Sequence, residues 1–296
     1  MEVVFLGTSS MQPTAERNLI GILISCESEK ILVDCGEGIQ RQMKVAKFPP
    51  TKITRILITH NHTDHTLGLG GLVRNLVANQ YSKTLEIYGP KGIKDTYFHL
   101  VQALNKKLDI KVKIHEVSEG VVFKTSDLIV EAKKLDHTLP CFGYSIKETD
   151  RRKINLNYLK KFGLKQHPIL GKLQKGEDIE WEGKKILAVK GTKLIRGKKI
   201  SIVLDTKKCK NAVEIAKDAN LLICESTFSN DEEKKAKEFK HLTSKHAAEI
   251  AKEAKVKALI LTHFSQRYKI VSEIEKEAKI VFKKVKCSKD FMKVKI

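Results

Sequence analysis

The 296-residue sequence lacks the features that mark membrane, secreted and modular proteins. No apolar run approaches the length needed to cross a bilayer, and the first seven residues are typical of a strand, not of a signal peptide. The six cysteines form no CxxC pair, so neither a zinc knuckle nor a redox motif is supported. No Gly/Ser/Pro-rich linker divides the chain. We therefore expect a cytoplasmic protein, without membrane contact, whose residues 1–296 form one domain with a substantial core.

Strand-like and helix-like segments alternate along the chain, which predicts an α/β protein. Strands are expected at Glu2–Leu6, Gly21–Cys26, Lys30–Asp34, Ile53–Thr59, Leu85–Tyr88, Lys111–Val117, Leu128–Leu135, Tyr144–Lys147, Ile200–Leu204 and Ala258–Thr262. Helices are expected at Ile39–Val45, Leu69–Ala78, Ile93–Lys106, Asn211–Asp218, Ser244–Ala254 and Val271–Val281.

Four potential metal ligands crowd one loop between an expected strand and the next helix. His60, His62, Asp64 and His65 lie within six residues. Imidazole and carboxylate are ligands of zinc and similar divalent ions, and their spacing lets one loop serve two adjacent metals. The alternative is a polar loop in which Asp64 or Thr66 caps the helix. Because the sequence has only ten histidines, this clustering favours the metal interpretation.

Three further potential ligands follow expected strands later in the chain. His137 comes after Leu128–Leu135, Asp205 ends the strand at 200–204, and His263 ends the strand at 258–262. Each alone is more often a structural polar residue. Together they repeat one placement, which a site along one edge of a sheet requires.

A basic segment without acids stands out at residues 151–175. Elsewhere lysines alternate with glutamates, so this segment departs from its background even in a chain of formal net charge +21. The alternative is a solvated charged face, but the charge pattern favours contact with nucleic acid. The segment has few aromatic residues, which argues against stacking on single-stranded bases. Its cations are Arg151, Arg152, Lys153, Lys160, Lys161, Lys165, Lys172 and Lys175.

Short blocks spread over nearly the whole chain resemble one family. They are Phe5–Ser10, Asp34–Gly38, the histidine loop, His137-Thr138 with Gly143-Tyr144, Leu204–Thr206, Glu225–Phe228, His241 with Thr243, and Leu261–Ser265 with Arg267-Tyr268. The histidine loop resembles the metallo-β-lactamase superfamily, and the later blocks resemble its tRNase Z family, which removes 3′ trailers from precursor tRNA. Three departures are Cys224, Leu242 and His167-Pro168, which replace a usual histidine, serine and Gly-Pro pair.

The resemblance implies an αβ/βα sandwich with a protruding basic arm at about residues 148–180, which would grip tRNA. It implies two Zn²⁺ per subunit, although manganese or iron also suits such ligands. One metal would be held by His60, His62 and His137, the second by Asp64, His65 and His263, and Asp205 would bridge them. Arg17 lies in a stretch similar to the family's loop for the RNA 3′ end. A homodimer is also implied.

The resemblance further implies the roles of three catalytic residues. Asp64 would orient or deprotonate the attacking water, and His241, assisted by Glu225, would protonate the departing 3′ oxygen. The tRNA would keep a 3′-hydroxyl and the trailer a 5′-phosphate. Structural alternatives are a strand-end carboxylate for Glu225 and a helix-entry residue for His241, ahead of a Thr243 cap. For the whole protein, the alternatives are a hydrolase of small phosphodiesters and a non-catalytic RNA-binding protein.

Overall fold

The computed structural model describes residues 1–102 and 109–296, which divide into two compact units. The main unit comprises Met1–Ile146 and Lys199–Ile296, and the second unit comprises Lys147–Lys198. The last part of the expected helix at 93–106 lies outside the described residues.

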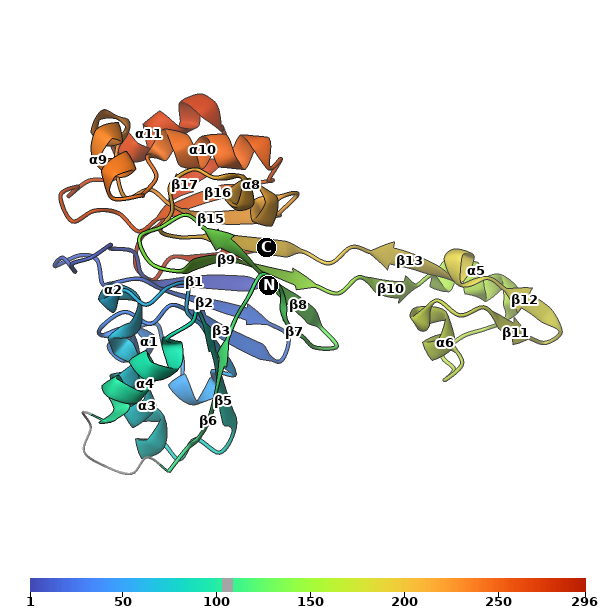
Figure 1. Cartoon of the computed structure of the whole chain (residues 1–296). Helices are drawn as coiled ribbons and strands as arrows, with labels where there is room; N and C mark the ends of the chain where they lie inside the picture. Colours follow the sequence, from blue (N-terminus) through green and yellow to red (C-terminus); the bar gives the residue numbers. More distant parts are fainter. Residues whose placement is uncertain (103–108) are drawn as a thin grey trace. The chain divides into compact units, whose positions relative to one another are not determined.

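Two seven-stranded sheets form the centre of the main unit (Figure 1). The first sheet has the order β18 (Lys293–Lys295), β1 (Glu2–Gly7), β2 (Gly21–Cys26), β3 (Glu29–Val33), β4 (Arg55–Leu57), β5 (Thr84–Gly89) and β6 (Lys111–Glu116). The second has the order β17 (Val285–Cys287), β16 (Leu259–Thr262), β15 (Leu221–Glu225), β14 (Lys199–Val203), β9 (Cys141–Glu148), β8 (Leu128–Leu135) and β7 (Gly120–Lys124). Strands β3 to β6 and β14 to β17 pair in parallel.

Helices cover the outer face of each sheet, so the main unit has four layers. Apolar side chains of both sheets form one core between them, and each helical layer adds a core of its own. The first sheet carries α1 (Ile39–Val45), α3 (Gly68–Ala78) and α4 (Ile93–Gln102). The second carries α8 (Lys210–Ala216), α10 (Ser244–Glu253) and α11 (Ser272–Val281). The expected α/β sandwich is confirmed. None of the described helices is both long and apolar enough to span a bilayer.

Short elements complete the main unit, and several bounds differ from expectation. The short elements are η1 (Pro50–Lys52), α2 (Thr63–Thr66), η3 (Asn230–Glu232) and α9 (Glu233–Glu238). Strand β4 is shorter than the expected 53–59 because the Thr59 N–H bonds to the Asp34 carboxylate instead of to a neighbouring strand. No side chain caps α2 or α3, whereas the Thr243 hydroxyl caps α10 as the sequence suggested.

The second unit contains the whole basic segment and a small core of its own. Its strands form two antiparallel pairs, β10 (Arg151–Ile154) with β13 (Thr192–Ile195) and β11 (Ile179–Trp181) with β12 (Lys184–Ile186). Its helical turns are α5 (Leu156–Leu159), η2 (Lys160–Phe162), α6 (Leu170–Lys175) and α7 (Ala188–Gly191). The buried core consists of Leu159, Leu164, Leu173, Ile179, Ile186 and Ala188. The expected arm, at about 148–180, falls within this unit.

Candidate metal centre and active site

The main unit brings all seven potential ligands to one place. They follow the carboxyl ends of β4 in the first sheet and of β8, β14 and β16 in the second. The clusters that could hold a metal are His60, His62, His137 and Asp205; Asp64, His65 and His263; and Asp205, His241 and His263. Residues that the sequence separates by up to 203 positions thus share one site, as the placement at strand ends predicted.

In the first group, three imidazoles turn nitrogen atoms toward one another. His62 Nδ1 lies 2.9 Å from His60 Nε2 and 3.3 Å from His137 Nε2. Each nitrogen of a neutral imidazole either donates or accepts a hydrogen bond, so hydrogen bonds can join these three nitrogens only if the rings differ in which nitrogen carries a proton. A cation instead accepts a lone pair from each of the three nitrogens. Burial lowers the pKa of each of these imidazoles, which favours their neutral, ligating form.

In the second group, a carboxylate joins two imidazoles. His65 Nε2 lies 3.2 Å from His263 Nε2, and Asp64 Oδ2 lies 3.4 and 3.6 Å from these two atoms. Burial would raise the pKa of Asp64, but the neighbouring His65 and His263 hold it far below its usual range. The carboxylate is therefore ionised and available as a ligand.

Asp205 lies between the two groups. Its Oδ2 is 3.6 Å from His60 Nε2, 3.6 Å from His65 Nε2 and 3.8 Å from His137 Nε2. Its Oδ1 is buried and lies 3.3 Å from His263 Nδ1, but it accepts no hydrogen bond from the described residues. A buried carboxylate oxygen without a donor is costly, and a cation would satisfy it. The donor set, with no cysteine, fits divalent metal at both groups.

A second ring of contacts orients the histidines. The Nδ1 atoms of His60, His65, His137 and His263 lie within 3.1 Å of Thr59 Oγ1, Asp34 Oδ2, Lys240 O and Thr227 Oγ1, respectively. Such contacts fix the ring so that Nε2 faces the centre. Burial would lower the pKa of His65, but the charges of Asp205, Asp34 and Asp64 raise it. Thr227 belongs to the Glu225–Phe228 stretch that resembles the family, whereas the sequence gives no signal for Lys240.

Three of these residues have left-handed backbone conformations that non-glycine residues rarely adopt. The φ angles are 56° at Asp34, 41° at Asp205 and 59° at His263. Such conformations cost about 1–3 kcal/mol each and persist where the surroundings demand them. Here they lie just after the ends of β3, β14 and β16, at two potential ligands and at the carboxylate that bonds to His65.

The partly buried His241 pairs with the fully buried Glu225 beside the metal groups. His241 Nδ1 lies 3.1 Å from Glu225 Oε1, and its Nε2 makes no hydrogen bond to the described residues. Burial would lower the pKa of His241, but Glu225 and Asp205 raise it to about 9. His241 is thus protonated at neutral pH with one nitrogen free. Both structural alternatives also hold, since Glu225 ends β15 and Thr243 caps α10.

The two departures near this pair point away from it. Cys224 and Leu242 are fully buried in the core between the second sheet and its helices. They contribute to packing there, and neither forms a hydrogen bond with His241 or Glu225 in the structure. The substitutions therefore leave the pair's own contacts intact.

A circuit of linked residues connects the His241–Glu225 pair to His137, one of the potential metal ligands. Lys240 accepts a hydrogen bond from His137 Nδ1 through its carbonyl oxygen, and its Nζ lies 3.0 Å from Asp136 Oδ1 and 3.3 Å from His137 O. Thr206 N donates to Glu225 Oε1 at 2.8 Å. These hydrogen bonds, a further one from Asp136 N to Thr206 Oγ1, and the peptide bond from Lys240 to His241 close a circuit. It runs through His137, Lys240, His241, Glu225, Thr206 and Asp136.

A cavity of about 330 Å³ opens onto these groups. Met11, a residue that is 73% exposed, lines it together with His62, Asp64, Asp205 and His241. The Met11 N–H donates to Asp64 Oδ2 at 2.8 Å. The cavity therefore gives a substrate access to both metal groups and to His241.

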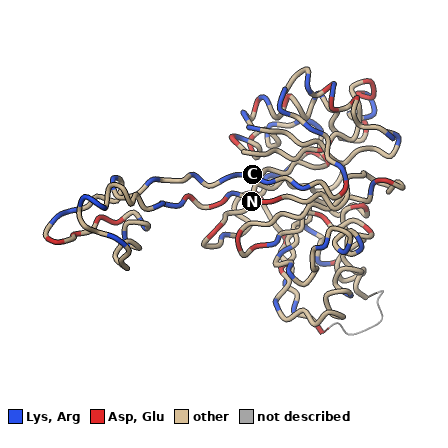
Figure 2. The backbone as a smooth tube through the Cα atoms, turned by 180° about the vertical axis from the view of Figure 1, so that it is seen from behind, with Lys and Arg blue, Asp and Glu red and all other residues tan. Residues whose placement is uncertain are grey.

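The predicted RNA-binding residues fall into two environments. Seven of the eight in the basic segment are exposed, and Arg152 is half-buried with a bond to Thr192. Figure 2 marks the lysines and arginines in blue along the backbone of both units. All eight belong to the second unit, so they lie outside the unit that forms the metal groups. Arg17 belongs to the main unit and is only 8% exposed, where it donates to Ser265 O. Its RNA contact stays a prediction, because in this structure it supports a loop.

Comparisons with known proteins place these features in context. The family model "Anti-Pycsar protein Apyc1" matches residues 1–154. The ribonuclease Z of Streptococcus sanguinis is 38% identical over the full length of both chains. The structure of human tRNase Z, short form, is 29% identical with a TM-score of 0.74, and covers 100% of this chain and 99% of that one. The metallo-beta-lactamase fold protein YhfI from Bacillus subtilis is 21% identical with a TM-score of 0.71 over 99% and 98%, which shows the fold.

Proposed function

The chain belongs to the ribonuclease Z family, and we propose that it is a metal-dependent endoribonuclease that cleaves precursor tRNA on the 3′ side of the discriminator nucleotide. One observation carries this proposal. Two groups of metal-type ligands lie on either side of Asp205 and face the same cavity as His241. A site of that kind suits hydrolysis of a phosphodiester, in which charge develops on both sides of the phosphorus.

The proposed ligands are the seven residues of the two groups. His60, His62 and His137 would hold one ion and Asp64, His65 and His263 the other, with Asp205 shared. Zinc is the proposed metal, and manganese and iron suit the same atoms. When bound, two such ions supply Lewis acidity, which activates water and stabilises charge on the phosphate.

The chain's own residues would handle the protons. The Met11 N–H holds Asp64 Oδ2, so the carboxylate is fixed in position to orient the attacking water. On the other side, His241 would donate its proton from Nε2 to the departing 3′ oxygen, while Glu225 holds Nδ1. The products would be a tRNA with a 3′-hydroxyl and a trailer with a 5′-phosphate.

The basic segment is proposed as the tRNA contact. Exposed lysines and arginines bind phosphates without reading sequence, and folded RNA is recognised by shape and charge. A cytoplasmic location and a homodimer, in which one subunit's arm serves its partner's site, are family expectations that we carry forward as proposals. Full-length similarity to ribonuclease Z proteins favours this function over hydrolysis of small phosphodiesters.

Cleavage of a 5′-labelled precursor tRNA tests the proposal. We expect wild-type protein to make one cut after the discriminator nucleotide and leave a 3′-hydroxyl, whereas Asp64→Ala and chelator-treated protein make none. Asp95→Ala, which removes an exposed carboxylate on α4, should cleave normally. An intact precursor after incubation with metal-loaded wild type would overturn the proposal, and hydrolysis of a small phosphodiester by that sample would support the alternative enzyme.

A further inference from the structure

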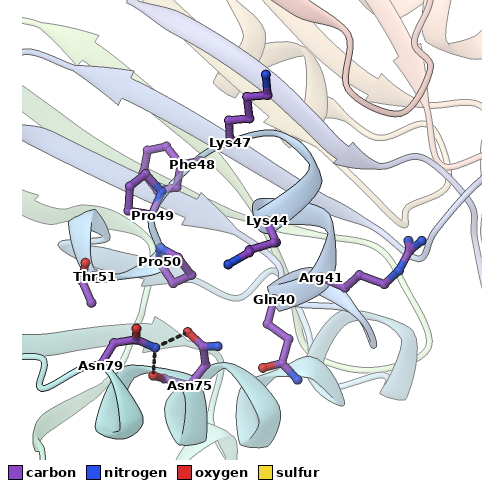
Figure 3. A pocket seen from close by; sticks show the side chains of 10 residues that line it. All are labelled: Gln40, Arg41, Lys44, Lys47, Phe48, Pro49, Pro50, Thr51, Asn75 and Asn79. Carbon is purple, nitrogen blue, oxygen red and sulfur yellow. Dashed lines mark hydrogen bonds between the residues drawn. The ribbon is translucent and has the colours of Figure 1, made fainter.

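A second cavity of the main unit has no part in the site described above. It measures about 620 Å³ and lies between α1, η1 and the end of α3 (Figure 3). None of its lining residues is a proposed metal ligand or catalytic residue. Its volume lies in the range of small-molecule sites, about 300–1,000 Å³.

The charges around this cavity have one sign. Arg41, Lys44 and Lys47 line it, and no acid does. Neither Lys44 nor Lys47 forms an ion pair with a residue that the structure describes, and Figure 3 shows the Lys44 side chain reaching across the cavity toward Pro50. Between residues 38 and 83 the only acid is Asp64, which belongs to the metal groups. Unpaired cations in a concave site concentrate anions.

The remaining walls offer a flat apolar surface and carboxamides. The half-buried ring of Phe48 stands beside Pro49 and Pro50 (Figure 3). Opposite, Asn79 Nδ2 donates to the backbone oxygen and to Oδ1 of Asn75, at 2.8 and 3.2 Å. In the side chains, Asn75 Nδ2 and Asn79 Oδ1 make no hydrogen bond within the described chain. One donor and one acceptor are thus fixed side by side.

These walls match the parts of a nucleotide. Bases stack on aromatic rings, carboxamides bond to base edges, and lysine binds phosphate as a point charge. We propose that this cavity binds a nucleotide, with the phosphate beside Lys44 and the base between Phe48 and the Asn75–Asn79 pair. The nucleotide is either a free mononucleotide or an unpaired nucleotide of an RNA. The proposal is independent of the cleavage reaction, since the two sites share no residue.

Binding to the full-length chain tests the proposal. The probes are AMP, adenosine, inorganic phosphate and 5′-phosphorylated pentaadenylate, measured by calorimetry, together with the side-chain amide signals of Asn75 and Asn79 in NMR spectra. We expect saturable binding of AMP or the oligonucleotide and shifts of both amide signals. Lys44→Glu should weaken that binding about tenfold or more, whereas Lys252→Glu, an exposed lysine on α10, should not.

The two sources of the nucleotide give different results. Tighter binding of AMP than of pentaadenylate identifies a free nucleotide, and the reverse order identifies an RNA strand. If Lys44→Glu and Lys252→Glu lost equal binding affinity, the binding would depend only on the net charge of the protein, and the proposal would be overturned. So would the absence of saturable binding, or phosphate binding as tightly as AMP. Because Lys44 is exposed, we expect Lys44→Glu to fold normally, and its circular dichroism spectrum checks this.

Discussion

The main unit and the second unit use charged residues in opposite ways. In the main unit, the proposed ligands and their supporting residues are nearly all buried, and the Nδ1 atoms of His60, His65, His137 and His263 each face a defined partner. In the second unit, cations project into solvent from a core of six small or aliphatic side chains. Chemistry at one phosphorus atom requires fixed atoms, whereas phosphate contact along a large RNA requires only charge at the surface. We therefore expect single substitutions to reduce activity strongly at the site in the main unit and only slightly in the second unit.

Removal of Asp205 should give the steepest effect. In Asp205→Ala, no oxygen remains between the two ligand groups, so both lose a ligand and the histidines lose the charge that faces them. We expect cleavage at background and fewer bound metal ions per chain, measured by gel assay and elemental analysis. Normal metal content with normal cleavage would show that Asp205 is not shared.

Removal of His241 should act on the rate alone. We expect His241→Ala to lower kcat by about 10²–10⁴-fold, the usual contribution of a general acid, with metal content unchanged. The protonated form is the donor, so wild-type activity should persist below the pKa of about 9 and fall as the pH rises through it. The pH profile of His241→Ala should lack this alkaline decline. A variant that keeps the decline would assign it to another group.

A smaller loss is expected at the circuit that supports His137. Lys240→Met removes the bonds from Nζ to Asp136 and to His137 O, but keeps the carbonyl oxygen that accepts the His137 N–H. We expect metal affinity to fall by about tenfold, at the low end for outer contacts of a metal site. Competition with a chelator measures it. Lys234→Met, on the exposed α9, is the control.

The smallest effect is expected in the second unit. Lys172→Ala removes one exposed cation on α6, so tRNA binding should weaken a few-fold while kcat stays constant. The slope of log affinity against log salt should become shallower by about 1. Filter binding at several salt concentrations measures both. A fall in kcat comparable to that of His241→Ala would erase the contrast between the two units.

The sequence predicted the positions of the proposed metal ligands but not the residues whose hydrogen bonds orient them. His137, Asp205 and His263 were identifiable because each follows an apolar strand-like segment. Thr227 and Lys240 were not, because their roles depend on which backbone and side-chain atoms meet after folding. Asp34 and Thr227 lie in stretches that resemble the family, but the bonds of Asp34 to Thr59 and His65 cross 25 and 31 residues, and sequence alone does not reveal them. The small strands and turns of the second unit were also missed, since its short apolar stretches carry little periodicity.

The closeness of His65 and His263, 198 residues apart in sequence, also bears on folding. A metal held by both would tie the first quarter of the chain to its last part, and the unfolded chain has no such preformed site. Bound metal therefore favours the folded state by about 4 kcal/mol when its free concentration is a thousand times its dissociation constant. The melting temperature should accordingly rise with metal concentration, so the proposed centre would stabilise the fold of the main unit in addition to its proposed catalytic role.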